Sequence, residues 1–176
     1  MKKLITAILI LSVFCFAQCK KNKPDSTGLP AATQEGKNTF GFLLNGQLWK
    51  PQGSNGTANL SIDYDAGISD GGMGISAYKI ISANEREYFK IGIIDSLNSK
   101  TAPFSINLSN TGLYRIGFTN NQCSLFSFDN TQVNGIITVT KLDRINRIIS
   151  ATFSATLNKT GCTEIKITDG RLDMKF

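Results

Sequence analysis

The sequence contains no histidine among its 176 residues. A Ser-His-Asp triad or a Cys-His pair therefore cannot be assembled from this chain alone. The stretch GISDG at residues 67–71 fits the nucleophile-elbow pattern G-x-S-x-G, but without a histidine we interpret Ser69 as a hairpin-loop residue. The stretch GMGISA at residues 72–77 partly matches a dinucleotide-binding loop, yet it leads into alternating residues where that loop needs a helix. Neither motif predicts an active site.

Acidic residues are also few, with 13 Asp and Glu in the whole chain. Asp63, Asp65 and Asp70 lie close together in sequence, but their order does not match a helix-loop-helix calcium loop, so we interpret them as a solvated turn. Asp169 and Asp173 are the other carboxylates considered as a glycosidase pair, and nothing in the sequence sets their separation. We predict no metal, no cofactor and no enzymatic activity, with a carboxylate-based hydrolase acting on polysaccharide as the alternative.

Long apolar runs are missing as well. Residues 4–14 form the one mostly apolar stretch near the N-terminus, and they are too few for a membrane span, which needs about 20 apolar residues. Lys2 and Lys3 precede this stretch, so residues 1–18 are typical of a secretory signal peptide.

Two cysteines follow the apolar stretch, at positions 15 and 19. Residues 16–19, FAQC, resemble the lipobox of bacterial lipoproteins, in which a peptidase cuts before a cysteine that carries an acyl chain such as palmitate. Gln18 departs from that pattern, because a small residue is usual there. We predict lipidation of Cys19 and loss of Cys15 with the signal peptide. The alternative is ordinary cleavage after Ala17.

The segment after Cys19 has the composition of a linker. Residues 20–38 lack apolar periodicity and are rich in Lys, Pro, Ser, Thr and Gly. We therefore predict a lipidated tether over residues 19–38 and a single β-domain over residues 39–176. The formal net charge of +6 lies partly in the signal peptide and tether, and no basic stripe alternates with aromatics. Nucleic acid is thus not predicted as a partner.

The apolar pattern beyond residue 39 has the period of β-strands. In IISATFSATL, residues 148–157, apolar side chains alternate with Ser and Thr, so one face is apolar and the other hydroxylated. Similar alternation occurs at residues 60–64, 91–93, 104–108, 114–118 and 126–128, and turn signals occur at residues 45–46, 55–56, 70–71 and 134–135. We predict an all-β, antiparallel sandwich or partly open barrel of about 9–11 strands.

The alternation of apolar residues shifts by one position near the C-terminus, at Asp169-Gly170. Either these two residues form a hairpin turn, or they form a bulge in one long terminal strand. We favour the bulge, because a strand from residue 163 to 176 would match the length of the preceding strand.

Cys123 and Cys162 are the two cysteines left once Cys15 and Cys19 are assigned to the signal and anchor. An envelope compartment permits their oxidation, so we predict a disulfide between them. Two buried thiols are the alternative.

Three stretches resemble parts of small Bacteroidota lipoproteins of unknown function: FGFLLNGQLWKP at residues 40–51, GIITVTKLDRINRIISATFSATL at residues 135–157 and ITDGRLDMKF at residues 167–176. This resemblance implies the lipid anchor and the β-fold but no activity.

The predicted function follows from the anchor and from the missing catalytic groups. We expect a monomeric, lipid-anchored binding or structural module on the periplasmic face of the bacterial outer membrane, with a glycan or an envelope protein as partner. The hydroxylated face of residues 150–156 suits such a partner. Trp49, the one tryptophan, and the four tyrosines are interpreted mainly as packing residues. A ligand site, if present, is expected where Trp49 meets residues 63–70.

The lipidation of Cys19 has a direct test in the mass of the native protein. We expect intact-mass analysis to show the lipid increment on a chain that begins at Cys19. A chain that begins at Gln18 and carries a free thiol would contradict the prediction. Protease shaving of whole cells tests the orientation, since ready cleavage would place the domain on the outside.

Overall fold

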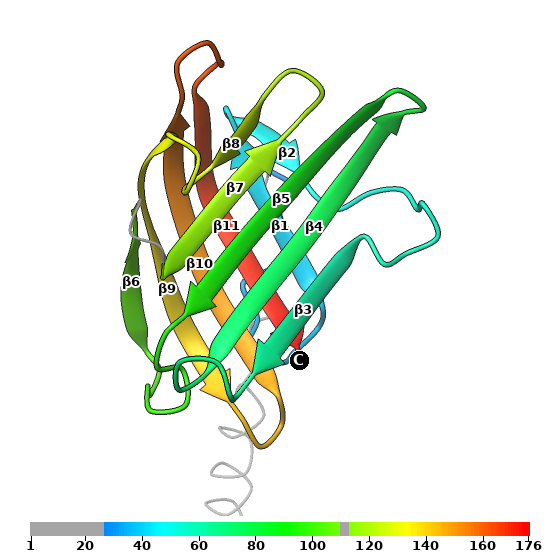
Figure 1. The fold of residues 1–176 in the computed structure, drawn as a ribbon. Helices are drawn as coiled ribbons and strands as arrows, with labels where there is room; N and C mark the ends of the chain where they lie inside the picture. The colour runs from blue at the N-terminus through cyan, green and yellow to red at the C-terminus, as the bar shows by residue number, and fades with distance from the viewer. Residues whose placement is uncertain (1–26, 110–112) are drawn as a thin grey trace, which may run out of the picture.

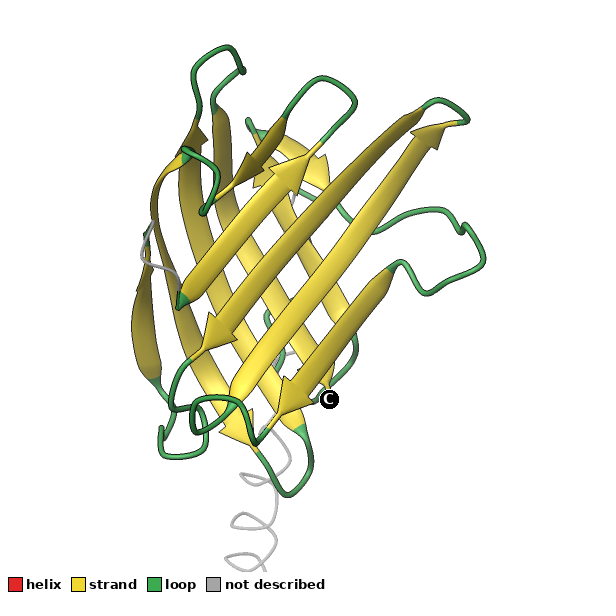
Figure 2. Ribbon diagram, viewed as in Figure 1, coloured by secondary structure: helices red, strands yellow, loops and turns green. Residues whose placement is uncertain are grey.

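The computed structural model describes residues 27–109 and 113–176, and this part of the chain contains eleven strands and no helix (Figures 1 and 2). The predicted signal peptide and Cys19 lie outside the described residues. The described residues include no helix that could span a bilayer. The strands are β1 (Thr39–Leu44), β2 (Gln47–Trp49), β3 (Leu60–Asp65), β4 (Gly72–Ser82), β5 (Glu85–Ile94), β6 (Phe104–Leu108), β7 (Tyr114–Thr119), β8 (Ser124–Phe126), β9 (Gln132–Asp143), β10 (Ile148–Asn158) and β11 (Ile165–Lys175).

The strands form two antiparallel sheets that pack face to face as a sandwich and do not close into a barrel. One sheet has six strands in the order β2-β1-β11-β10-β9-β6, and the other has five in the order β3-β4-β5-β7-β8 (Figure 1). The predicted all-β antiparallel fold is confirmed, and the sandwich is the correct alternative. The motifs that imitate catalytic loops also lie as expected, since Ser69 falls in the β3–β4 loop and residues 72–77 lie in β4.

The alternation read from the sequence sets which side chains enter the core. In β10, Ile149, Ala151, Phe153 and Leu157 are buried between the sheets, while Thr152 is exposed on the outer face. Five aromatic side chains from both sheets gather in this core: Phe40, Phe42, Trp49, Phe89 and Phe153. Large aromatic side chains bury the most apolar area per residue. This cluster therefore stabilises the contact between the sheets.

The parity change at Asp169-Gly170 is a bulge, as favoured from the sequence. Strand β11 continues through it, and its pairing with β10 shifts between Phe153, opposite Gly170, and Ala155, opposite Ile167. Asp169 adopts a positive φ of 53°, and a Cβ on Gly170 would come within 2.5 Å of the Phe153 ring. The bulge therefore re-aims the strand so that apolar side chains face the core on both sides of it.

One predicted turn is wrong. Asn134-Gly135 lies inside β9 rather than between strands, and Gly135 pairs with Ala155 of β10. A Cβ on Gly135 would lie 2.6 Å from the carbonyl oxygen of Ser154. The glycine is needed here for the close approach of two strands, and a strand glycine of this kind looks like a turn signal in sequence. Asn45-Gly46, by contrast, does connect β1 to β2, with φ values of 49° and 82°.

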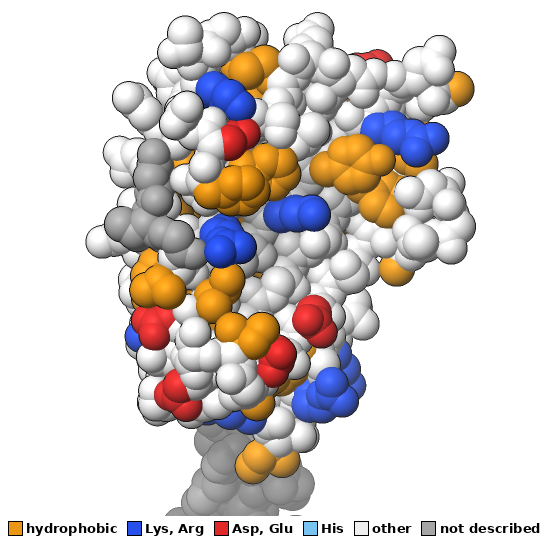
Figure 3. All heavy atoms as spheres, viewed as in Figure 1, with side chains coloured by type: hydrophobic (Ala, Val, Ile, Leu, Met, Phe, Trp, Pro, Cys, Tyr) orange, Lys and Arg blue, Asp and Glu red, His pale blue; other side chains and the backbone are white. Residues whose placement is uncertain are grey.

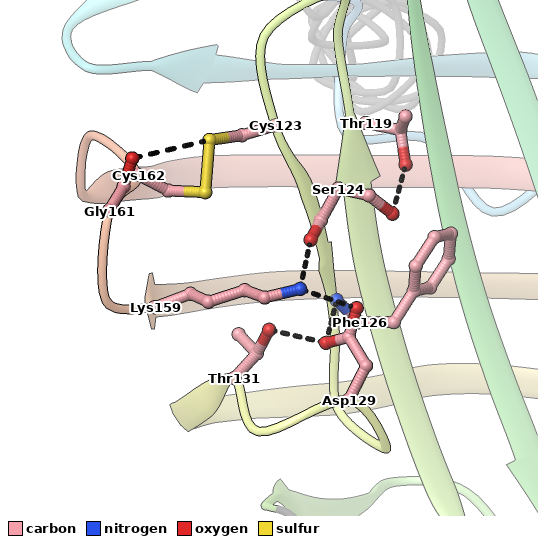
Figure 4. Close-up of polar contacts among 9 residues, drawn as sticks. All are labelled: Thr119, Cys123, Ser124, Phe126, Asp129, Thr131, Lys159, Gly161 and Cys162. Atoms are coloured by element: carbon pink, nitrogen blue, oxygen red, sulfur yellow. Dashed lines mark hydrogen bonds and ion pairs between the residues drawn. A yellow bond between two sulfur atoms is a disulfide. The ribbon is translucent and has the colours of Figure 1, made fainter.

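The disulfide joins the two sheets at one end of the sandwich (Figure 4). Cys123 precedes β8 of the five-stranded sheet, and Cys162 lies in the loop between β10 and β11 of the six-stranded sheet. Their sulfur atoms are 2.10 Å apart and their Cα atoms 5.9 Å apart, which is bonding geometry, as predicted. Closing a separation of 39 residues stabilises by roughly 3–4 kcal/mol in the chain-entropy model.

Residues 27–38, which the sequence assigned to the tether, lie on the outer face of the six-stranded sheet. Leu29 is only 1% exposed, and the carbonyl of Pro30 accepts a hydrogen bond from Arg171 of β11. The folded domain therefore includes this segment. The earlier part of the predicted tether lies outside the described residues and stays a prediction.

Asp173 of β11 holds this segment in place. Its carboxylate is 1% exposed and accepts hydrogen bonds from the Thr33 hydroxyl at 2.5 Å, from the Ser150 hydroxyl at 2.8 Å and from the backbone N–H groups of residues 35–37 at 2.8–3.3 Å. Burial alone raises the pKa of Asp173, but the hydrogen bonds outweigh it and lower this pKa from 3.8 to about 2. Asp173 is thus a structural carboxylate, and its burial removes it from the glycosidase pair considered above.

The pKa of Asp173 predicts a specific pH dependence of stability. A carboxyl whose pKa falls from 3.8 to about 2 on folding contributes about 2 kcal/mol, so we expect Asp173→Asn to lower the free energy of unfolding at pH 7 by at least that amount. Because the folded pKa is the lower one, the contribution is complete above about pH 4 and is lost as the pH falls through 2. Urea unfolding across this pH range measures it.

The control for this experiment is Asp169→Asn, on the same strand. Asp169 is exposed, so its substitution should leave the free energy of unfolding at pH 7 nearly unchanged. If the difference between wild type and Asp173→Asn stayed constant from pH 7 to pH 2, the carboxylate charge would not be the stabilising group.

Candidate functional site

A groove of about 430 Å³ crosses the outer face of the five-stranded sheet. It runs over β3, β4, β5, β7 and β8, on the face turned toward the viewer in Figure 3. Hydrophobic side chains and Lys or Arg side chains lie next to one another on this face (Figure 3). The groove combines an apolar floor with a few polar groups at its sides, which is the usual composition of a ligand site.

The floor of the groove is short of side chains because four glycines face it: Gly72 and Gly74 of β4, Gly92 of β5 and Gly117 of β7. Gly74 and Gly92 pair directly across the two strands. A Cβ on Gly74 would meet nothing within 4 Å, and one on Gly92 would reach only the Arg115 side chain, at 3.4 Å. Glycine inside a strand is destabilising by about 0.5–1 kcal/mol relative to Ala, and it often marks a place that another group approaches closely.

The two sides of the groove carry opposite charges. Asp63 pairs with Gly74, Gly74 with Gly92, and Gly92 with Arg115, so these residues form one row across four strands. At the usual strand spacing the backbones of Asp63 and Arg115 are about 14 Å apart. Asp65 lies beside Asp63 on β3, and Lys90 lies on the central strand β5, two residues from Gly92 and between Ser76 and Gly117. A ligand in the groove would meet carboxylates over β3 and cations over β5 and β7.

Two phenylalanine rings form the end of the groove over β8. Phe126 packs on Gly117, where a Cβ would lie 2.1 Å from its ring. Phe128 stacks on Phe126, with ring centroids 5.4 Å apart and planes 21° apart, and it is 69% exposed. The Arg115 guanidinium lies 6.0 Å from the Phe128 ring centroid. The exposed Phe128 ring at the end of the groove is a candidate contact for a ligand.

Asp129 organises the turn that presents these rings (Figure 4). Its Oδ1 accepts hydrogen bonds from the Phe126 backbone N–H at 3.1 Å and the Thr131 hydroxyl at 2.7 Å, and its Oδ2 pairs with Lys159 Nζ at 2.9 Å. Lys159 also donates to the carbonyl of Ser124. Burial alone raises the pKa of Asp129, but the hydrogen bonds and the charge of Lys159 outweigh this and lower it. The turn is therefore held to the β10–β11 loop by both this ion pair and the nearby disulfide.

The carboxylates of the groove are placed on one side only. Asp63 and Asp65 are alternate residues of one strand, with Cα atoms about 7 Å apart, and Asp65 Oδ1 accepts a hydrogen bond from the Gly67 N–H at 2.8 Å. Glycosidases place two carboxylates on either side of the bond that they cleave. Among the described residues that line the groove, Asp63 and Asp65 are the carboxylates, while Arg115 lies across the floor on β7 and Lys90 on the central strand β5.

Trp49 is a packing residue, as interpreted from the sequence, and it does not meet residues 63–70 in a common site. Asp63 and Asp65 line the groove, but Trp49 is 1% exposed in the core, where it stacks on Phe42 at 4.7 Å and donates from Nε1 to Glu87. Its burial follows from its position on the inner side of β2. In residues 27–109 and 113–176, no three His, Cys, Asp or Glu side chains are grouped to hold a metal.

The hydroxylated face predicted from residues 150–156 is partly covered. Ser150 is buried against Asp173 beneath the N-terminal segment, and Thr152 is the exposed member of the series. The sequence reasoning missed Lys90, Phe126, Phe128 and the glycine row as groove residues. Glycines recurring in strand segments were the available signal, but strand order decides whether they meet.

In comparisons with protein-family models, with curated proteins and with solved structures, nothing matched this chain.

Two of the floor glycines should respond in opposite ways to the same substitution. Gly117→Ala places a methyl group against the Phe126 ring, so we expect a loss of about 1–3 kcal/mol in the free energy of unfolding. Gly74→Ala enters open space in a strand, so we expect no loss and a gain of up to about 1 kcal/mol. Urea unfolding of both variants measures the difference, and equal destabilisation would contradict the described floor.

Proposed function

We propose that the mature protein is a lipid-anchored, non-catalytic binding module of the bacterial envelope, and that the groove on the five-stranded sheet is its ligand site. The observation that carries this proposal is the glycine pair of Gly74 and Gly92, which is open at Gly74 and lies between Asp63 and Arg115. Glycine in a strand lowers stability, and no atom of the described residues lies within 4 Å of a Cβ placed on Gly74. A bound ligand is the reason that we assign to this open floor.

The anchor in this proposal is the acylated Cys19, on the periplasmic face of the outer membrane. Leu29 is already packed on the domain, so roughly ten residues separate the anchor from the folded part, and they span at most about 35 Å. The domain would thus work close to the membrane surface as a monomer. A short connection of this kind suits a module that holds a neighbouring envelope component rather than one that reaches for distant partners.

The alternative function is a polysaccharide hydrolase that uses Asp63 and Asp65. Their shared position in the groove favours this alternative over one based on Asp169 and Asp173. Their placement on one side of the groove speaks against it, because an acid and a base must act on opposite sides of the scissile bond.

A blocked groove tests the proposed site. Gly74→Val adds a β-branched side chain to the open floor, and Thr152→Val adds the same side chain to the outer face of the other sheet, as the matched control. Each purified chain is immobilised and exposed to solubilised native envelopes. We expect wild type and Thr152→Val to retain the same component and Gly74→Val to lose it. Loss only with Thr152→Val would move the site to the six-stranded sheet.

The same proteins test the absence of catalysis. Incubation with a glycan and peptide library should give no products detectable by mass spectrometry. Turnover that Asp63→Asn or Asp65→Asn abolishes would overturn the non-catalytic proposal and establish the hydrolase.

A further inference from the structure

We infer that the groove binds a neutral glycan, with one uncharged sugar ring lying on the floor formed by Gly74 and Gly92. This inference rests on the proposed function and names the ligand class of the same site. Three features carry it: the flat space, the paired charges and the exposed ring of Phe128.

The protein itself shows how a flat group packs on this floor. The Phe126 ring lies directly on Gly117, close enough that a Cβ there would overlap it. Gly117 pairs with Lys90, and the neighbouring row holds Gly92 and Gly74. A Cβ on Gly74 would point into open space, and one on Gly92 would touch the Arg115 side chain at 3.4 Å. A second flat ring therefore has room beside Phe126 on the same sheet, above Gly74, because no described atom lies within 4 Å of a Cβ placed there.

The charges at the two sides select against charged ligands. A polymer that carries one sign of charge meets like charge in part of the groove, an anionic one at Asp63 and Asp65 and a cationic one at Lys90 and Arg115. This repulsion offsets its attraction to the groups of opposite charge. A sugar ring has hydroxyl groups that donate and accept hydrogen bonds. It can donate to the carboxylates and accept from the cations, without adding a charge. Hydrogen bonds to charged groups are about twice as strong as those between neutral groups.

An aromatic side chain of a protein partner would also fit the flat floor, but it suits the sides poorly. It would cover Asp63 and Lys90 without offering them hydrogen-bond partners, and desolvating unpaired charges is unfavourable. A sugar instead presents an apolar C–H face to the floor and to Phe128, which is 69% exposed, and hydroxyl groups to the sides.

Binding of defined oligosaccharides tests the inference. The probes are a neutral glucose hexasaccharide and a neutral mannose hexasaccharide, an acidic hexasaccharide of uronic acids, a cationic hexasaccharide of glucosamine, and an aromatic peptide, each titrated calorimetrically against the full mature chain. We expect at least one neutral probe to bind and the charged probes and the peptide to bind more weakly. Removing the exposed ring in Phe128→Ala should weaken neutral-probe binding by about tenfold.

Two further variants separate a hydrogen-bonding role from a structural one. Lys90→Met keeps the alkyl stem and removes the donor, and Asp63→Asn keeps the shape and removes the charge. Each should weaken neutral-probe binding by about tenfold while leaving the unfolding midpoint unchanged. Thr152→Val again serves as the control and should bind as wild type does.

The outcomes for the two proposals are distinguishable. Tighter binding of an acidic, cationic or peptide probe than of either neutral probe overturns the neutral-glycan inference. If Gly74→Val loses the native envelope component but neither neutral hexasaccharide binds wild type, the inference fails and the proposed site stands. If Gly74→Val retains the envelope component and binds the neutral hexasaccharides as wild type does, both proposals fail.

Discussion

The packing of the two sheets against each other is the constraint on which the other features depend. Every long strand turns one face inward, and the aromatic cluster of Phe40, Phe42, Trp49, Phe89 and Phe153 joins strands from both sheets. Because the inner faces carry the stability, the outer face of the five-stranded sheet can dispense with side chains. Gly74 and Gly92 lie on that outer face, directly behind Met73, Ile75, Ile91 and Ile93 of the core. A groove at this place is compatible with the fold because the core beneath it is complete.

Two polar arrangements hold segments that lie outside the sheets, namely the N-terminal segment and the turn after β8. At one end Asp173 gathers the hydrogen bonds of the N-terminal segment, and its depressed pKa shows that its charged form is the one that folding favours. At the other end Asp129 pairs with Lys159 beside the disulfide (Figure 4). Together they hold the turn that carries Phe128. The first arrangement sets how close the domain lies to its proposed anchor. The second gives an exposed aromatic ring a defined position.

The prediction of the fold from sequence succeeded where the pattern was local. Alternation in residues 148–157 identified a strand and its buried face, and the parity change at Asp169-Gly170 pointed to the bulge. The pairing of Cys123 with Cys162 was predicted because they are the two cysteines that remain once Cys15 and Cys19 are assigned to the signal peptide and anchor. The prediction of a turn at Asn134-Gly135 is wrong, because Gly135 lies within β9, where it allows the close approach of β10. The interpretation of Trp49 as a packing residue is confirmed, but its expected meeting with residues 63–70 is wrong, because sequence does not say which face of a short edge strand turns inward.

The class of the fold, the apolar residues of its core and the lack of a histidine for a triad within this chain can be read from residue type and from spacing along one strand. The meeting of Asp63, Gly74, Gly92 and Phe128 in one groove, and of Asp173 with residues 33–37, is seen only in the folded domain. Those contacts join residues far apart in the chain. Strand order and register set them, and both arise from the long-range pairing of strands, which no local pattern records.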